Sequence, residues 1–188
     1  MLKRIRGFTL IELLIVVAIL GILAALLIPN AITAIQKAKQ KSTMKDVSVI
    51  STAITDYITD NGMAPVSPSG AYTAGPGFYN SLSPFYIKVM PVTDQWGTGF
   101  EVFCGAAVLG PYGIAEGLAD DFLVASLGRG GEVEGWSFDP LEPELGLEVV
   151  SKGEHFEKDL VQWNGSWIRA PRTASTAGGV APPPPPTP

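Results

Sequence analysis

Cysteine and histidine are nearly absent from this sequence, which has one of each among its 188 residues, Cys104 and His155. One cysteine excludes a disulfide within the chain, and one histidine excludes a metal site built from two or more imidazoles. We expect Cys104 to be a small buried side chain and His155 to lie on the surface. The glycine-rich stretch from Gly128 to Gly131 lacks the Lys-Ser/Thr ending of a phosphate-binding loop. We therefore predict no catalytic residue and no cofactor.

Basic residues are fewer than acidic ones, 13 against 18, and the isoelectric point is about 4.8. This balance argues against a nucleic-acid partner, because proteins that bind nucleic acids carry a basic face that displaces counterions. The charge is also segregated: residues 1–45 carry +6, whereas residues 94–159 hold fourteen acidic and three basic residues. Basic residues on both sides of an apolar run, followed by an acidic region, are typical of a membrane-anchored protein whose larger part lies in solution.

The apolar run extends from Phe8 to Ile28 and contains one ionisable residue, Glu12. As a helix it is about 31 Å long, which matches the hydrocarbon core of a membrane. The run is too long for the apolar core of a secretory signal peptide. The stronger alternative is a plain membrane anchor, and Glu12 argues against it, because a carboxylate in hydrocarbon costs several kcal/mol unless it has a partner. That partner must come from the start of the chain or from another molecule.

The segment from Gly7 to Glu12, GFTLIE, resembles the class III signal of type IV pilins and type II secretion pseudopilins. In that family a basic leader ends in glycine, phenylalanine follows, and glutamate is the fifth residue counted from that phenylalanine. The resemblance implies that a prepilin peptidase cuts between Gly7 and Phe8 and methylates the new Phe8 amine. It also implies that Glu12 of one subunit pairs with the Phe8 amine of a neighbour and so fixes the register of a filament.

Helical periodicity continues beyond the apolar run. Pro29 lacks an N–H group and predicts a kink or local unwinding, whereas Asn61-Gly62 predicts the end of the helix. We expect one helix over residues 8–60, its second half packed on a globular head. Its lysines form a solvated face that could also meet the acidic heads of neighbouring subunits. The apolar stripe of this helix comprises Ile32, Ile35, Val47, Ile50, Ile54, Tyr57 and Ile58.

The head, residues 63–172, lacks helical periodicity and is rich in glycine and proline. Short strands are predicted at residues 100–103, 122–125, 160–163 and 167–168, and Asn164-Gly165 predicts a hairpin between the last two. The predicted fold class is α+β, pilin-like, with a long N-terminal helix packed on a small antiparallel sheet.

The head also resembles the major pseudopilin of type II secretion. Three segments carry this resemblance, in the same order: DQWG at residues 94–97, Asp121 to Gly131, and DLVQW at residues 159–163. That branch has an aspartate near a bound calcium ion where this chain has Arg129-Gly130-Gly131. An arginine there opposes a dication, so we predict no metal and a solvated acidic surface between residues 132 and 158. Calcium ligands on this loop would come from Glu132, Glu134, Asp139 and Asp159.

The resemblance implies a structural subunit, not an enzyme, of a type II secretion pseudopilus, with a single pass through the inner membrane and a periplasmic head. Its partners would be the prepilin peptidase, further copies and other pseudopilins, and an inner-membrane assembly platform. The alternative is a type IV pilin or minor pilin that serves adhesion, motility or DNA uptake. The predicted segments are a cleaved leader (1–7), a transmembrane and filament-core helix (8–28), an amphipathic helix (29–62), the head (63–172) and a proline-rich tail (173–188).

Overall fold

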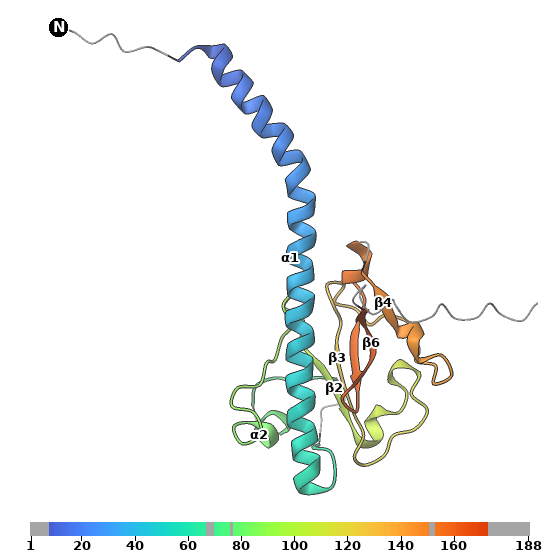
Figure 1. The fold of residues 1–188 in the computed structure, drawn as a ribbon. Helices are drawn as coiled ribbons and strands as arrows, with labels where there is room; N and C mark the ends of the chain where they lie inside the picture. The colour runs from blue at the N-terminus through green and yellow to red at the C-terminus, as the bar shows by residue number, and fades with distance from the viewer. Residues whose placement is uncertain (1–7, 67–69, 76, 151–152, 173–188) are drawn as a thin grey trace, which may run out of the picture. The chain divides into compact units, whose positions relative to one another are not determined.

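A computed structural model describes residues 8–66, 70–75, 77–150 and 153–172 (Figure 1). Its contacts divide the chain into two compact units, Met1–Ala38 and Lys39–Pro188. The described residues of the second unit are called the head unit below. The predicted leader, residues 1–7, and the predicted tail, residues 173–188, lie outside the described residues. The segment boundaries stay predictions.

The first unit contains the start of helix α1 (Leu10–Asn61). Every side chain from Phe8 to Ile35 is exposed, including Ile32 and Ile35 at the start of the predicted apolar stripe. An 18-residue window of α1 has a mean hydropathy of 3.1, and none of it is buried. By length and composition, α1 is therefore suited to cross a membrane once, as the apolar run predicts.

Helix α1 passes through Pro29 without a break. The Thr33 hydroxyl donates to the Pro29 carbonyl at 3.0 Å, and the Asn30 side-chain amide donates to the Leu26 carbonyl at 3.2 Å. Proline itself cannot donate to the carbonyl four residues earlier. The kink at Pro29 stays a prediction.

In the head unit, α1 buries one side. Helix α1 ends at Asn61, one residue beyond the predicted boundary. The next residue, Gly62, adopts a φ of +74°, which suits glycine because it has no Cβ. The Gly62 N–H donates to the Ile58 carbonyl at 2.7 Å, which closes the last turn. The buried residues of α1 recur at intervals of three and four; they are Gln40, Thr43, Val47, Ile50, Ser51, Ala53 and Ile54.

The head unit also contains a six-stranded sheet, in the order β1-β2-β3-β5-β6-β4. The expected α+β fold is confirmed, and the predicted hairpin is present: Asn164 and Gly165 adopt φ values of +46° and +78° between β5 and β6. A short helix, α2 (Phe78–Leu82), precedes β2. The strands are β1 (Gly70–Ala71), β2 (Glu101–Cys104), β3 (Phe122–Ser126), β4 (Leu147–Val149), β5 (Leu160–Trp163) and β6 (Ser166–Arg172).

One pair in the sheet differs from the antiparallel expectation, because β4 pairs in parallel with β6. Strand β6 is longer than predicted, and its last three residues extend past its pairing with β5. The acidic segment returns as β4 and pairs with these three residues, Ala170, Pro171 and Arg172 (Figure 1).

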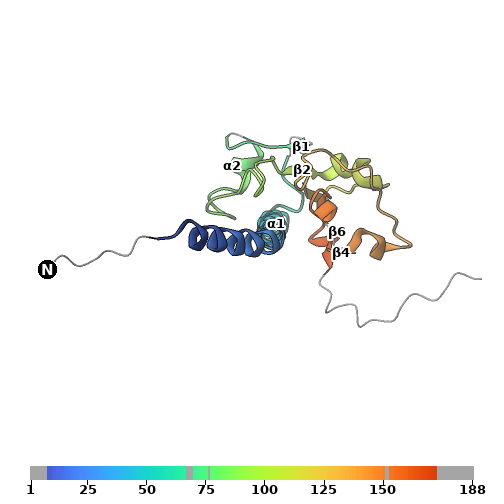
Figure 2. The ribbon, with the colours of Figure 1, turned by 90° about the horizontal axis from the view of Figure 1, so that it is seen from above.

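Both faces of the central strand β3 are covered, so all five of its residues are buried. Val124 packs in a cluster with Val47, Ile50 and Ile54 of α1. Leu123 and Ala125 point to the opposite face, where a second cluster contains loop residues such as Val108 and Ile114. Figure 2 shows β4 and β6 beside α1 when the molecule is viewed from above.

Candidate functional site

The residues expected to assemble a filament lie at the start of α1. Thr9 precedes the first helical residue, and its hydroxyl accepts a hydrogen bond from the Glu12 N–H at 3.3 Å. In return, Glu12 Oε2 accepts from the Thr9 N–H at 2.9 Å and from the Thr9 hydroxyl at 2.7 Å. This reciprocal pair is a capping box, and it places the carboxylate at the positive end of the helix dipole.

The capping box gives Glu12 a partner within its own chain, one that the sequence reasoning missed although Thr-x-x-Glu is its usual signature. Among the described residues both hydrogen bonds that the Glu12 carboxylate accepts end on Oε2, and none ends on Oε1. Phe8 is 77% exposed. Gly7, the other predicted processing residue, lies outside the described residues.

The first head motif, residues 94–97, forms a closed turn around the buried side chain of Asp94. Its Oδ1 accepts from the N–H groups of Trp96 and Thr98, both at 2.9 Å. Its Oδ2 accepts from the Ser126 hydroxyl at 2.8 Å, which joins this motif to the second. The Ser126 hydroxyl in turn accepts from the Gly128 N–H at 3.2 Å.

Position 128 requires a glycine, both because of its backbone conformation and because there is no room for a Cβ atom. Its φ is +58°, and a Cβ there would lie 2.4 Å from the Lys158 carbonyl oxygen. The second motif thus has a glycine where its turn requires one, next to the Ser126 hydroxyl that binds Asp94 of the first motif.

Asp121 and Asn164 join the second motif to the β5–β6 hairpin. The Asn164 side-chain amide donates to Asp121 Oδ1 at 2.6 Å, and its carbonyl oxygen accepts from the Phe122 N–H at 2.8 Å. Asp121 Oδ2 also accepts from the Leu118 N–H at 2.7 Å. These contacts hold the start of β3 against the hairpin, which is an architectural role.

Asp159, the first residue of the third motif, is 1% exposed. Its Oδ2 accepts from the Tyr112 hydroxyl and from the Glu134 N–H, both at 3.0 Å. Its Oδ1 is buried and accepts no hydrogen bond from the described residues. Burial raises the pKa of Asp159 to about 6, because desolvation outweighs the two hydrogen bonds, which lower it.

This raised pKa predicts an unusual pH dependence of stability. In the unfolded chain the pKa of an aspartate is 3.8, so the folded head binds the proton more tightly. The contribution of Asp159 is therefore complete below about pH 4 and is lost as the pH rises through about 6. On acidification from about pH 7.5 to about pH 5, we expect the wild type to gain on the order of 1 kcal/mol more unfolding free energy than Asp159→Asn. Urea unfolding followed by tryptophan fluorescence measures this difference, and identical pH profiles would contradict it.

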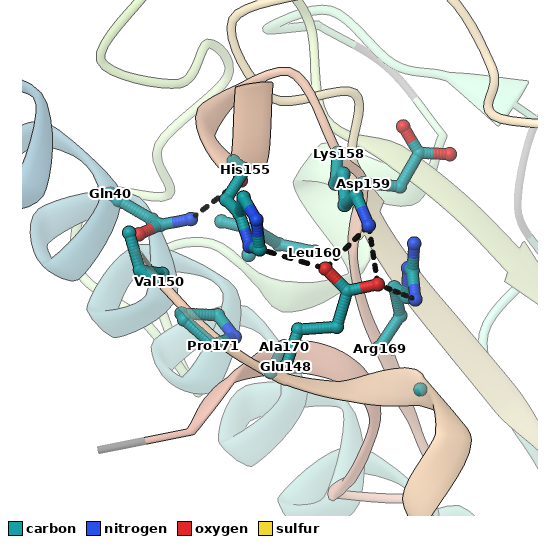
Figure 3. A pocket seen from close by; sticks show the side chains of 11 residues that line it. Gln40, Glu148, Val150, His155, Lys158, Asp159, Leu160, Arg169, Ala170 and Pro171 are labelled. Atoms are coloured by element: carbon teal, nitrogen blue, oxygen red, sulfur yellow. Dashed lines mark hydrogen bonds and ion pairs between the residues drawn. The ribbon is translucent and has the colours of Figure 1, made fainter. Parts of the chain in front are cut away.

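An ion-pair cluster around Arg169 occupies the region where the acidic loop meets β6 (Figure 3). Arg169 is 4% exposed and binds Glu134 with two bonds, Nε to Oε2 at 3.1 Å and Nη2 to Oε1 at 2.6 Å. Its Nη1 donates to Glu148 Oε1 at 3.2 Å. The guanidinium carbon also lies 5.0 Å from the centre of the Trp136 ring, a cation–π contact.

Glu148 is the second acid of this cluster. Lys158 Nζ donates to both of its oxygens, and His155 Nδ1 lies 3.3 Å from Oε2. Burial alone would raise the pKa of Glu148, but the Lys158 hydrogen bond and the Arg169 charge together lower it. The hollow beside these side chains encloses about 10 Å³, which is room for about one water molecule and not for an organic ligand.

Some acids of the loop are therefore less solvated than the sequence predicts. Glu134 and Glu148 are half-buried and paired, not solvated, and His155 is half-buried beside Glu148, not on the surface. Glu132 and Asp139 are exposed, as a solvated surface requires. Cys104 is half-buried at the end of β2.

The donor set in this region does not fit a calcium site. Calcium needs six to eight oxygen ligands, and the described residues contain no group of three or more His, Cys, Asp or Glu side chains arranged to hold a metal ion. The acids that come together here instead face the side chains of Arg169 and Lys158.

Sequence reasoning did not identify Arg169. The available signal was the segment WIRAP, in which one cation stands between apolar residues, together with the excess of acids in the preceding loop. A buried cation needs carboxylates nearby, and the loop supplies them.

Comparisons with known proteins agree with both resemblances. The family model "Prokaryotic N-terminal methylation motif" matches residues 2–28. No solved structure matches the chain. Type II secretion system core protein G of Klebsiella pneumoniae is 31% identical over 128 residues, which cover 61% of this chain and 91% of the relative. The protein of the same name from Pseudomonas aeruginosa is 33% identical over 139 residues, 71% of this chain and 89% of the relative. The chain thus belongs to the family of type II secretion system core protein G, the pseudopilin branch that its three head motifs resemble.

Proposed function

We propose that this chain is a structural subunit of a type II secretion pseudopilus, processed by a prepilin peptidase and assembled from the inner membrane to drive protein export. The observation that carries the proposal is the similarity to core G proteins over about nine-tenths of their length. The methylation motif at residues 2–28 and the exposed apolar half of α1 support it. The alternative, a type IV pilin, is not favoured, because both relatives are named for type II secretion.

Processing prepares the N-terminus for assembly. Cleavage between Gly7 and Phe8 removes three basic residues and leaves a free amine one residue before the capping box. The peptidase then methylates this amine. A single α1 helix serves as the anchor, with the head in the periplasm, and other pseudopilins and an inner-membrane platform are the assembly partners.

Glu12 sets the axial register of the filament. Thr9 satisfies one carboxylate oxygen within the chain, and the Phe8 amine of a neighbouring subunit pairs with the other. In hydrocarbon an unpaired charge is costly, so docking in the one register that pairs both groups is favoured. The apolar helices then exchange lipid contacts for helix contacts. This role needs no catalytic residue in the chain.

Intact mass spectrometry and a filament assay together test the proposal. In cells with the secretion system, the wild-type chain is expected to lack residues 1–7 and to carry one added methyl group. The variant Glu12→Gln keeps the shape of the side chain but removes its charge. It is expected to be processed normally and to show about a tenfold lower fraction of chain in sheared filaments.

A matched control separates the charge from general damage to the apolar helix. Leu13→Met lies next to Glu12 and conserves volume and polarity, so it is expected to assemble like the wild type. Recovery of the leader still attached, in cells with active peptidase, would contradict the processing step. Normal assembly of Glu12→Gln would contradict the pairing.

A further inference from the structure

The acidic loop of the head unit carries a groove lined by both apolar and charged side chains, called the acidic groove here. It encloses about 610 Å³. Leu141 and Leu145 are 90% and 62% exposed. This exposure is unusual for two large apolar side chains that line the same groove on a monomeric protein. The groove is lined by Leu141, Glu142, Pro143, Glu144, Leu145, Leu147, Val149 and Arg172.

A second exposed surface lies on α1 within the head unit, called the basic helix face here. Lys41, Lys45 and Val49 are exposed and four residues apart, so they share one side of the helix. No ion pair with a described residue involves either lysine. Tyr86 and Ile87 flank this face, with a hollow of about 280 Å³ between them and the helix.

The two surfaces share no residue: the acidic groove is lined by residues of the acidic loop, β4 and the end of β6, and the basic helix face by α1 together with Tyr86 and Ile87. Contact between them therefore joins two copies through unlike surfaces. Such a heterologous contact leaves one surface free on each end and can extend into an open helical filament.

We propose that the acidic groove of one copy receives the basic helix face of another copy within the filament. The inference rests on the proposed function, because it assigns a contact between neighbouring heads. Glu142 and Glu144 line the groove and are exposed, with Glu144 in a surface pair with Arg172. The helix face offers two lysines that form no ion pair with a described residue, and an apolar side chain. Charge complementarity sets the register of this contact, and burial of the leucines stabilises it.

The chain's own tail is a poorer occupant. It begins immediately after Arg172, which lines the groove, but residues 173–188 carry no charged side chain to match the rim. Proline-rich segments dock in grooves lined by aromatic side chains, and the residues that line this groove are aliphatic or charged.

Charge reversal tests the electrostatic part of the contact. In cells that assemble the wild-type chain, Glu142→Lys/Glu144→Lys is expected to lower the fraction of chain in filaments about fivefold. Lys41→Glu/Lys45→Glu is expected to do the same, and the chain with all four changes is expected to recover. Glu116→Lys/Asp120→Lys makes the same change of charge on exposed residues outside both surfaces, and should assemble normally. Thermal unfolding of each purified variant confirms that it is folded.

A photo-crosslinker placed at Leu145 identifies the occupant. Mapping the linked peptides by mass spectrometry, with tagged and untagged copies co-expressed, is expected to give residues 41–52 of another copy. A link to residues 173–188, or to a different protein, overturns the inference. So does normal assembly of the reversed variants or failure of the fourfold variant to recover, and in both cases the proposed function stands. Absence of wild-type filaments overturns the proposed function and this contact with it.

Discussion

Replacing Arg169 with methionine is expected to lower the free energy of unfolding of the head by about 3 kcal/mol. Methionine fills much of the space of the arginine stem but provides no cation. Glu134 and Glu148 would then face each other half-buried without Arg169 between them. Breaking a buried ion pair from one side costs more than the pair contributes, because the remaining charge stays poorly solvated. The cost stays below the upper limit for such pairs because both acids keep some access to water.

Denaturation of the full chain in detergent, followed by tryptophan fluorescence, measures this loss. Trp136 lies against the guanidinium, so it is one of the four tryptophans whose emission changes on unfolding. The matched control is Arg172→Met, which removes a surface pair with Glu144 and is expected to cost at most about 0.5 kcal/mol. Equal stability of the two variants would contradict the role given to Arg169. A midpoint that depended on added calcium would contradict the view that protein cations hold the loop.

Replacing Gly146 with alanine is expected to destabilise the head by about 2–4 kcal/mol. A Cβ at this position would lie 1.8 Å from the Ile168 carbonyl oxygen and 2.9 Å from the Trp136 ring. Both neighbours belong to packed structure, and one of them is backbone, so the segment before β4 must move away from β6. The parallel pairing of β4 with β6 is expected to weaken with it. Urea unfolding and limited proteolysis within residues 139–150 measure the two effects.

Gly135→Ala is the control for this substitution. It lies in the same acidic loop, and a Cβ there meets nothing within 4 Å. Its unfolding free energy is expected to stay within about 0.5 kcal/mol of the wild type. If Gly146→Ala unfolded like Gly135→Ala, the close approach of the loop to β6 would not exist in solution.

Local chemistry explains which elements the sequence revealed. Helix α1 was predictable because its periodicity, its Asn61-Gly62 ending and its apolar run are all properties of nearby residues. The hairpin at Asn164-Gly165 was predictable for the same reason, since two positive φ values favour these two residues. The GFTLIE motif identified the family and the candidate assembly site, although its Thr9–Glu12 capping box was overlooked.

The prediction that the whole acidic loop is solvated is wrong, because the structure of this loop depends on residues distant in the sequence. A run of glutamates has no period that marks two of them for burial. Glu134 and Glu148 become half-buried only because β6 brings Arg169 between them. Likewise, β4 depends on β6, which supplies Ala170, Pro171 and Arg172 as its pairing partners.

The sequence alone determined the long helix, the α+β class, the hairpin and the family, because each follows from neighbouring residues or from a contiguous motif. Tertiary structure alone decided which charges are buried, how Asp94 and Ser126 join two motifs, and which apolar side chains of the head unit stay exposed. These depend on the desolvation and pairing of groups that approach one another only when the sheet has formed.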